Sequence, residues 1–557
     1  MTKSHRLLLA LFALTTFFVC NWALPTDIME SRNLVTAREM AEEGHWLVPT
    51  MNGELRLAKP PLPTWVAGVI ETVRPDSLGA QRTAAGIMGL LWTVFLFLTV
   101  KQLSKRQDFA LLTALVFMTS YQTVLMSRVA TWDIYCHALM MGAIYFLVRG
   151  LTPPDVKSGD TLRQSGAKHS EGKRVWLYLP LAGLMMGLSF LSKGPVSFFA
   201  LLLPFLIGWV TFFRPSLKGR WLPLIAMVFI CAAVSSWWYA YLFIFQPISA
   251  HAAVHGESTA WASHNVRPWY YYWRFFSETG VWAVVMLAAL AIPYWKKNLT
   301  DKRTYLTAIL WTLATIFFLS LMPEKKIRYL LPVMAPCAMS VACLLEHFRE
   351  KRDSLSRVTF RTSGYVVGLV ILAMPAILFF VLHVAILKAI VLSILFVLLA
   401  AVLIRATWKW KVGTFVVAVC LVFALTECTL LGEVGSAFGI TPKHGIGLTR
   451  NNPALKQYTF YYPADEPLRI EEVYQAHRKI PALQTNNAKD VMDRLPFVLV
   501  SDKPISSELP AAVLKDIDTT YIGTYDDNVH PRTSRRYNPL FVKKLTILKK
   551  RQHNEPN

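Results

Sequence analysis

The chain of 557 residues is 54% apolar, has a mean hydropathy of +0.38 and carries a formal net charge of +23. This composition excludes a disordered chain and an ordinary soluble domain, and it is typical of a protein with many membrane spans. The excess of Lys and Arg has two explanations, nucleic-acid binding or the preference of basic residues for cytoplasmic loops, and the loops decide between them.

The first apolar segment, residues 7–24, follows the basic start "MTKSHR", as a signal peptide would. The sequence after it, "NWALPTD", has no small-x-small cleavage site, so we expect an uncleaved span. About thirteen apolar segments are long enough to cross a bilayer, at residues 7–24, 83–103, 108–125, 132–149, 175–192, 195–213, 220–244, 276–294, 304–322, 329–346, 363–383, 385–404 and 412–432.

The loops between these segments account for the positive charge. If the N-terminus is cytoplasmic, the inner loops include "KQLSKR", "FRPSLKGR", "KKNLTDKR" and "HFREKRDSLSRVTFR", which are short and basic. Short cytoplasmic loops are where the bias toward Lys and Arg is informative. We therefore expect no nucleic-acid partner, and the odd number of spans predicts that the C-terminus lies on the outer, periplasmic side.

Three outer segments stand out in chain order. Residues 25–82 contain two candidate interfacial helices, near 30–43 and 62–73, and residues 246–275 contain "HNVRPWYYYWRFF". In the tail, the alternating runs "PFVLVSD", "TTYIGTY" and "LFVKKLTIL" and a helix at "AAVLKDI" predict a small α/β domain. The expected fold is an all-α polytopic membrane domain at 1–432, followed by a small soluble α/β domain at 433–557.

The seven cysteines lie in or beside apolar segments and form no Cys-x-x-Cys motif. They predict neither a zinc site nor a disulfide framework, and we interpret them as small buried apolar residues.

Ionisable residues at the membrane boundary are costly and are therefore functional candidates. Several cations, few acids and aromatic flanks would suit an anionic headgroup whose tail stays in lipid. The outer-side candidates are Glu30, Arg32, Lys59, Arg82, Arg128, Asp133, Lys193, His264, Arg267, Lys325, Lys326 and Arg328, with Tyr329 beside them.

The pattern resembles the polytopic glycosyltransferases that use polyprenyl-phosphate sugars, the superfamily of the protein O-mannosyltransferases and the aminoarabinose (lipid A) transferases, which have the GT-C fold. The run "ESRNLVTAREM" followed by "KPPL" is similar to the family's Asp-Glu-x-Arg-Tyr-Ala-x-x-Ala-Arg-Glu-Met run followed by Lys-Pro-Pro. The stretches "SRVATWD", "LSKGP", "RPWYYY" and "KKIRYLLP" match further family motifs in the family's order, and the resemblance covers most of residues 1–350.

The resemblance implies a role for each matched residue. Lys59, Arg267 and Tyr329 would hold the lipid phosphate, with Lys193 and Arg32 nearby. Glu30 and Asp133 would be the catalytic acids. Arg82, His264, Lys326 and Arg328 are secondary candidates for the same site.

Two positions depart from the family pattern. Met29 stands where the first acid of the Asp-Glu pair is expected, and Asn33 replaces the Tyr. Acid–base work must then rest on Glu30, on Asp133, or on an acceptor that needs no base, such as a phosphate.

Structural alternatives exist for these residues. Asp27 and Glu30 have capping-box spacing, Asp133 suits the positive end of a helix, and Lys59 suits an interfacial anchor. His264 has no second histidine at ligand spacing. We assign no metal ligands and no certain cofactor, and a divalent cation held by Glu30 or Asp133 stays open.

The resemblance implies an integral glycosyltransferase of the bacterial inner membrane, active on the periplasmic face. It would move a hexosyl or pentosyl group from a polyprenyl-phosphate donor to a lipid A-like or other glycolipid acceptor, by inverting displacement. The alternatives are transfer to Ser or Thr of a protein acceptor, and a flippase or transporter that binds the lipid-linked sugar without chemistry. A transporter would place ionisable groups near mid-span, and we find no clear pair of that kind.

Overall fold

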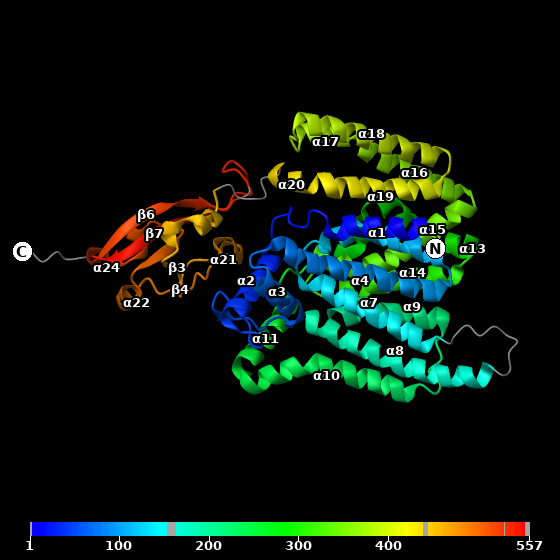
Figure 1. The fold of residues 1–557 in the computed structure, drawn as a ribbon, viewed down its shortest axis with the longest axis horizontal. Helices are drawn as coiled ribbons and strands as arrows, with labels where there is room; N and C mark the ends of the chain where they lie inside the picture. Colours follow the sequence, from blue (N-terminus) through cyan, green and yellow to red (C-terminus); the bar gives the residue numbers. More distant parts are fainter. Residues whose placement is uncertain (1–2, 153–162, 438–443, 529, 552–557) are drawn as a thin grey trace, which may run out of the picture. The chain divides into compact units, whose positions relative to one another are not determined.

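The computed structural model describes residues 3–152, 163–437, 444–528 and 530–551. The chain divides into two compact units (Figure 1). The helical unit comprises Met1–Trp22, Leu57–Val66 and Asp76–Leu431, and the mixed unit comprises Ala23–Arg56, Ala67–Pro75 and Gly432–Asn557.

The helical unit is built from long apolar helices joined by short turns. In chain order its elements are α1 (Lys3–Phe18), α4 (Leu78–Ser104), α5 (Gln107–Met118), α6 (Tyr121–Met126), α7 (Trp132–Leu151), α8 (Arg163–Lys193), the π-helical turn η1 (Phe198–Leu202), α9 (Leu203–Phe213), α10 (Trp221–Phe245), α11 (Pro247–Ser263), η2 (Trp269–Trp282), α12 (Ala283–Ala289), α13 (Ile292–Asn298), α14 (Lys302–Leu321), η3 (Ile327–Val333), α15 (Met334–Glu350), α16 (Ser354–Leu372), α17 (Met374–Phe380), α18 (Ile386–Trp408) and α19 (Val412–Thr429). The residues of α3 (Leu62–Val73) are divided between the two units.

Within the described residues, nine helices are long and apolar enough to span a membrane, or ten if the bent pair at 269–298 counts as one span. Each of the thirteen predicted spans has a helical counterpart. Three counterparts are short apolar helices, Leu9–Phe18, Gln107–Met118 and Phe198–Phe213, so the count of thirteen is not confirmed. The chain is nevertheless a multi-pass, mostly helical membrane protein, as expected.

The helices differ in how much of their surface other helices cover. In the span that ends in α15, 89% of the most apolar stretch is buried inside the protein, and in α7 the share is 78%. In α10 and α18 the share is only 17% and 28%. Exposed apolar helices of this length require lipid around them. In Figure 1, α8 and α10 lie together on one flank of the unit, and α16, α18 and α19 lie on the other.

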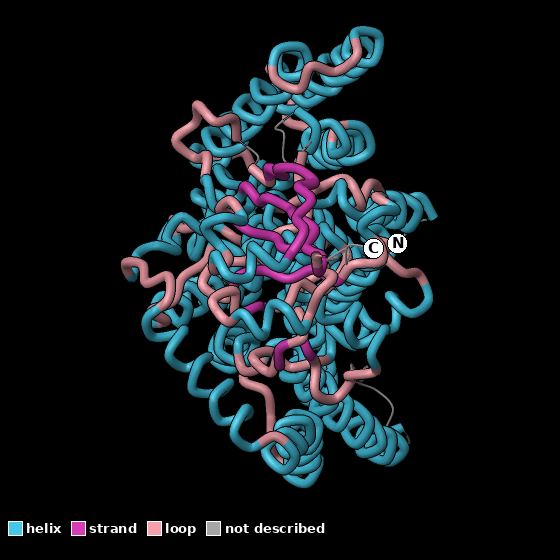
Figure 2. Tube along the Cα trace, turned by 90° about the vertical axis from the view of Figure 1, so that its left-hand side faces the viewer, coloured by secondary structure: helices cyan, strands magenta, loops and turns pink. Residues whose placement is uncertain are grey.

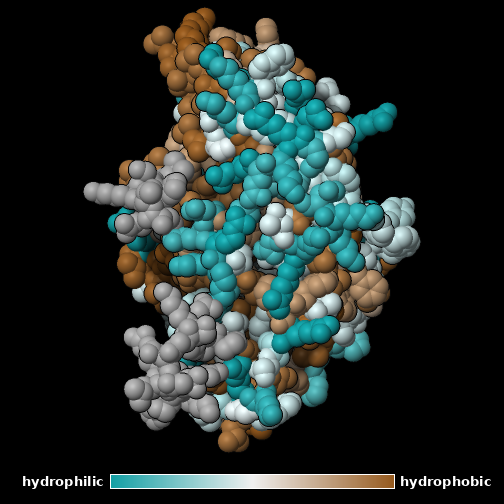
Figure 3. Space-filling view, turned by 90° about the vertical axis from the view of Figure 1, so that its right-hand side faces the viewer, coloured by the Kyte–Doolittle hydropathy of each residue, from teal (hydrophilic) through white to brown (hydrophobic). Residues whose placement is uncertain are grey.

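One end of the helical unit is polar. It carries the connections between α4 and α5, between α13 and α14, and between α15 and α16, which are the basic loops predicted to be cytoplasmic. Figure 3 shows hydrophilic side chains gathered across this face, with hydrophobic helix sides at its margins.

The mixed unit contains the predicted C-terminal α/β domain. Its five-stranded sheet has the order β4-β3-β5-β7-β6 and is visible in Figure 2. The strands are β3 (Thr459–Pro463), β4 (Ala482–Leu483), β5 (Phe497–Ser501), β6 (Ile517–Asp526) and β7 (Val542–Lys550). β3 runs parallel to β4 and β5, β7 runs antiparallel to β5 and β6, and Val498 lies opposite Ile547. The short hairpin strands β1 (Thr50–Met51) and β2 (Glu54–Leu55) and the helices α2 (Ile28–Glu43), α20 (Leu431–Ala437), α21 (Ile470–Ala476), α22 (Ala488–Asp493), α23 (Ile505–Glu508) and α24 (Ala511–Asp516) complete the unit, with the short 3-10 turns η4 (Ile446–Asn451), η5 (Pro453–Leu455) and η6 (Pro539–Phe541).

The helix predicted near 30–43 is α2, and the structure packs it into the mixed unit. Val35 belongs to the same apolar core as Phe460, Val498 and Ile547. Arg38 is buried, and its Nη1 atom lies 3.3 Å from the Nδ1 atom of His477. This helix therefore buries its middle against protein, which the amphipathic pattern alone did not indicate.

Candidate active site

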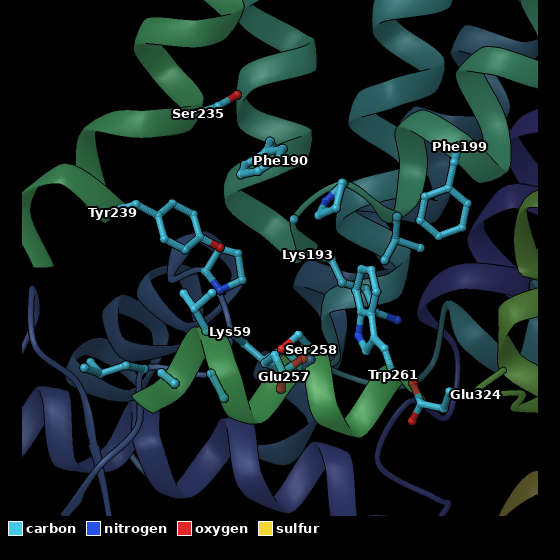
Figure 4. Close-up of a pocket in the computed structure, with 18 of the residues that line it drawn as sticks. Lys59, Phe190, Lys193, Phe199, Ser235, Tyr239, Glu257, Ser258, Trp261 and Glu324 are labelled. Atoms are coloured by element: carbon cyan, nitrogen blue, oxygen red, sulfur yellow. Dashed lines mark hydrogen bonds and ion pairs between the residues drawn. The ribbon is translucent and has the colours of Figure 1, made fainter. Parts of the chain in front are cut away.

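The helical unit contains a cavity of about 550 Å³ at the ends of several of its helices. Its walls come from the segment before α3, the end of α8, η1, α10, α11 and the segment before η3 (Figure 4). Most of the lining side chains are apolar, Lys59, Lys193, Glu257 and Glu324 supply the charged groups, and Tyr329 is among the residues that add a hydroxyl. Apolar walls with a few convergent polar groups are typical of a small-molecule site.

Lys59 enters the cavity from an extended stretch. Pro60 and Pro61 follow it, and because proline disfavours helical backbone in the residue before it, α3 begins only at Leu62. The Lys59 Nζ lies 2.5 Å from the Oε2 of Glu257 on α11, and Figure 4 shows the two side chains meeting at the cavity wall. Both side chains remain partly exposed.

Lys193 and Asp133 form the second ion pair of the site, after Lys59 and Glu257. α8 ends at Lys193 because Gly194 takes the left-handed conformation with φ +70°, which glycine tolerates. Asp133 lies in the first turn of α7, where a carboxylate is favoured by the helix dipole. The two side chains form a buried ion pair, and the Lys193 Nζ also lies 4.8 Å from the centre of the Tyr329 ring.

Glu324 organises the third group of polar residues. Its Oε1 lies 2.5 Å from the Lys326 Nζ and 3.6 Å from the His264 Nδ1, and its Oε2 accepts a hydrogen bond of 2.9 Å from the Tyr329 hydroxyl. Burial acts to raise the pKa of the Glu324 carboxyl, but the hydrogen bonds from Lys326 and Tyr329 outweigh it, and the pKa lies below its usual value. The carboxylate therefore stays charged near neutral pH.

The backbone holds the end of α11 against the segment before η3. The Glu324 amide donates to the Trp261 carbonyl at 3.2 Å, and Val266 pairs with Glu324 in an antiparallel bridge. The three carboxylates of the site thus come from three separate parts of the chain.

The structure brings several of the sequence-predicted residues together and leaves others apart. Lys59, Lys193 and Tyr329 line the cavity, and Asp133, His264 and Lys326 contact the lining groups. The Arg328 Cζ lies 6.0 Å from the centre of the Tyr329 ring. Arg267 is exposed outside the lining set, and its backbone amide donates to the Pro323 carbonyl at 3.4 Å.

Arg82 and Arg128 take part in contacts away from the cavity. The buried Arg82 guanidinium donates to the Asn21 carbonyl at 2.9 Å, and that of Arg128 donates to the Thr15 carbonyl at 2.8 Å. Both side chains join the end of α1 to the helices beside it. A packing role for Arg82 follows from these contacts.

Glu30 and Arg32 belong to the mixed unit. The Asp27 side chain accepts a hydrogen bond of 2.7 Å from the Glu30 amide, so Asp27 is the N-cap of α2. Glu30 is fully buried, and the Arg32 Nη1 lies 3.8 Å from the Met29 sulfur.

The sequence reasoning missed Glu257 and Glu324. Glu257 is the single acid of residues 246–275, and Glu324 directly precedes the "KKIRY" motif that drew attention to the neighbouring cations. A search for acids close to the matched cationic motifs would have found Glu324. For metal binding, no group of three or more His, Cys, Asp and Glu side chains suited to an ion occurs in the part of the chain that the structure describes.

Comparison with known proteins gives a consistent picture. The family profile of dolichyl-phosphate-mannose-protein mannosyltransferase matches residues 19–250. The undecaprenyl phosphate-alpha-4-amino-4-deoxy-L-arabinose arabinosyl transferase of Shewanella sediminis is 27% identical over 345 residues, which are 58% of each chain. The Aeromonas hydrophila protein of the same name is 26% identical over 396 residues, 66% of each chain. The chain thus aligns with less than two thirds of the length of these relatives.

Two solved structures share the fold over nearly the whole chain. The crystal structure of ArnT from Cupriavidus metallidurans bound to undecaprenyl phosphate has a TM-score of 0.69 at 15% identity and covers 99% of both chains. The apo state of the same protein has a TM-score of 0.66 at 14% identity and covers 98% of this chain and 96% of that one. The chain thus shares the fold of ArnT, and residues 19–250 are similar to the mannosyltransferase family.

Proposed function

We propose that this protein is a glycosyltransferase that takes a sugar from a polyprenyl-phosphate donor at the cavity of the helical unit and transfers it to a lipid A-like glycolipid. The observation that carries the proposal is the convergence of Lys59, Lys193 and Tyr329 on one cavity with largely apolar walls. Lysine ammonium groups and a phenol hydroxyl suit a phosphate, and the apolar walls suit the first isoprene units of its lipid.

The proposed reaction is a single displacement at C1 of the sugar. The acceptor oxygen forms a bond to C1 while the bond from C1 to the phosphate oxygen breaks, and that oxygen keeps the electron pair as polyprenyl phosphate leaves. The departing phosphate gains negative charge in the transition state, and Lys59 and Lys193 stabilise that charge in a cavity that excludes most water. Each such contact is worth roughly 3–4 kcal/mol in comparable oxyanion sites.

The acids have distinct proposed roles. Asp133 fixes the Lys193 ammonium beside the Tyr329 ring, and for a hydroxyl acceptor it or Glu30 removes the acceptor proton. An acceptor phosphate is already anionic and needs no base. The absence of an acid at position 29 is compatible with that second case.

The membrane arrangement belongs to the same proposal. The basic loops are cytoplasmic, the cavity opens toward the periplasmic side of the inner membrane, and residues 433–557 lie in the periplasm. The bias of the short basic loops supports this orientation. Arg267 and Arg32 remain proposed donor-binding residues on the resemblance alone.

The decisive experiment incubates the protein in nanodiscs with a panel of polyprenyl-phosphate sugars and a lipid A acceptor, and it measures release of free polyprenyl phosphate. We expect turnover with at least one donor and a loss of 100-fold or more in Lys59→Gln, roughly the effect of removing one oxyanion donor. Lys297→Gln, an exposed lysine on α13, is the matched control and should retain full activity.

Three outcomes would redirect the proposal. Full activity in both Lys59→Gln and Asp133→Ala would show that the reaction uses another site. Turnover only with a Ser- or Thr-containing peptide would move the assignment to a protein acceptor. Tight donor binding with no turnover for any acceptor would favour a transporter.

A further inference from the structure

The three acid–base pairs of the cavity differ in how accessible their carboxylates are. The side chains of Asp133 and Glu324 are 3% and 7% exposed, whereas that of Glu257 is 30% exposed. A buried carboxylate that leaves its cation stays in a medium of low polarity, which is costly. Glu257 is partly solvated already, so it is the carboxylate that can leave its lysine at the smallest cost.

The helix that carries Glu257 is weakly anchored in the protein interior. Among the described residues of α11, Ala250 is the only buried one. A Cβ atom added to the neighbouring Gly256 would meet no atom within 4 Å. The Glu257 side chain can therefore turn away from Lys59 without disturbing a packed core.

The proposed reaction changes the charge of the phosphate in the cavity. The donor is a phosphodiester with a charge of −1. The product is a phosphomonoester, which carries about −1.5 to −2 at pH 7. A site with Lys59 and Lys193 at the phosphate would hold the product more tightly than the donor, so product release would limit turnover unless something competed with the product.

We propose that Glu257 is that competitor, an exchangeable counter-ion that yields Lys59 to the donor phosphate and recovers it as the polyprenyl phosphate leaves. This inference rests on the proposed function, because it concerns the same phosphate. The Glu257 carboxylate repels the doubly charged product more strongly than the singly charged donor. Glu257 is thus a positioning residue that favours product release and does not touch the reacting atoms.

The test measures binding of two probes to the full-length protein in nanodiscs, a polyprenyl phosphate and the methyl diester of the same lipid. In Glu257→Gln we expect the monoester to bind about tenfold more tightly and the diester about threefold more tightly, as removal of one nearby negative charge predicts. A purely structural role for Glu257 would weaken both. Multiple-turnover kcat should fall by about tenfold, with a burst of about one product per enzyme and an unchanged single-turnover rate.

Matched variants isolate the effect at Lys59. Glu346→Gln removes a carboxylate paired with Arg106 outside the cavity lining and should leave both affinities unchanged. Combined with Lys59→Gln, the Glu257→Gln change should have little further effect on monoester binding, since its partner is gone. Thermal unfolding confirms that each variant is folded, and Glu257→Asp, which keeps the charge, should keep the monoester affinity within about threefold of the wild-type value.

The outcomes separate this inference from the function beneath it. If the wild-type protein binds neither probe, the proposed function fails. If the wild-type protein binds the monoester but Glu257→Gln binds it no more tightly, or tightens on both probes equally, the counter-ion role is wrong and the proposed function stands.

Discussion

At the scale of single residues, the buried Asp133–Lys193 pair combines two roles that mutation can separate. Its two side chains are almost completely inaccessible, so each charge depends on the other for stabilisation. Buried pairs of this kind contribute little net stability, yet removing one partner leaves an uncompensated charge. Lys193 also faces the Tyr329 ring at the cavity, which links the pair to the proposed phosphate site.

We expect Lys193→Met alone to destabilise the protein by about 3–5 kcal/mol, because the Asp133 carboxylate then loses its buried cation. The double variant Asp133→Asn/Lys193→Met should recover most of that stability but none of the transfer activity. Thermal unfolding in nanodiscs and the transfer assay measure the two effects separately. As a control, Asp518→Asn breaks an exposed pair with Arg551 and should cost under about 1 kcal/mol. Recovery of activity in the double variant would contradict a role for Lys193 in catalysis.

At the scale of elements, a small-residue motif sets the spacing of α8 and α10. Gly183 and Gly187 lie one helical turn apart on α8. A Cβ atom added at Gly183 would lie 2.2 Å from the Met227 carbonyl oxygen, and one at Gly187 would lie 2.5 Å from the Val234 Cβ. Glycines at this spacing allow two membrane helices to approach closely. The contact matters for the site because α8 ends at Lys193 and α10 carries Tyr239, both of which line the cavity.

Gly183→Ala should therefore force α10 away from α8. We expect a loss of about 1–3 kcal/mol of stability, the range measured for overpacked interiors, together with lower transfer activity. Gly172→Ala in the same helix is the matched control, because its added Cβ meets nothing within 4 Å. That control should be neutral or stabilising by up to about 1 kcal/mol. Equal stability of the two variants would show that the helices are not in tight contact at Gly183.

The mixed unit contains carboxyls whose ionisation opposes folding. Burial raises the pKa of Glu472 to about 8, that of Glu466 to about 7 and that of Asp527 to about 6. A raised folded-state pKa means that the folded state binds more protons than the unfolded state between the two pKa values. The contribution of these protonated carboxyls to stability is then fully present below about pH 4.5, and it is lost as the pH rises through the folded-state pKa values.

We expect protection of the β5 and β7 amides against hydrogen exchange, corrected for intrinsic rates, to fall as the pH rises from about 5 to 8. Glu472→Gln should flatten this decline. Each unit by which the folded-state pKa of a carboxyl exceeds its unfolded-state pKa lowers the free energy of unfolding at high pH by roughly 1.4 kcal/mol. The introduced amide can still accept the hydrogen bond from the Arg469 backbone. Asp518→Asn on β6, where the carboxylate is 59% exposed, should leave the decline unchanged. Protection that rises over this pH range would contradict the assignment of buried, protonated carboxyls.

At the scale of the whole molecule, periodicity and composition predicted the elements better than their contacts. The runs "PFVLVSD", "TTYIGTY" and "LFVKKLTIL" overlap strands β5, β6 and β7, and the helix at "AAVLKDI" overlaps α24. The span at 108–125, by contrast, breaks between α5 and α6, because a window of hydropathy does not detect where the backbone changes direction. The contact of Val35 with the sheet core joins segments over 400 residues apart and has no local signal.

The same limit applies to the candidate site. Lys59, Lys193 and Tyr329 lie in recognisable motifs, so the sequence indicated them before their positions were known. Glu257, the counter-ion of Lys59, and Glu324, which accepts the hydrogen bond from Tyr329, became apparent only when folding brought separate segments to one cavity. Charges are visible in a sequence, but the pairing of charges depends on tertiary structure.

The membrane orientation is the last property that the loops predict. We expect a cysteine in place of Lys489, which is exposed on α22, to react with a membrane-impermeant maleimide in intact spheroplasts, and one in place of Lys297 to react only after permeabilisation. Labelling of the parent protein gives the background from native cysteines such as Cys428, which is exposed. The reverse labelling pattern would show that the protein has the opposite orientation in the membrane, with the cavity toward the cytoplasm. Equal access at both sites would require an even number of spans between Lys297 and Lys489, so the error would lie among the spans from α14 to α19. The short apolar helices Gln107–Met118 and Phe198–Phe213 both precede Lys297 and do not affect that count.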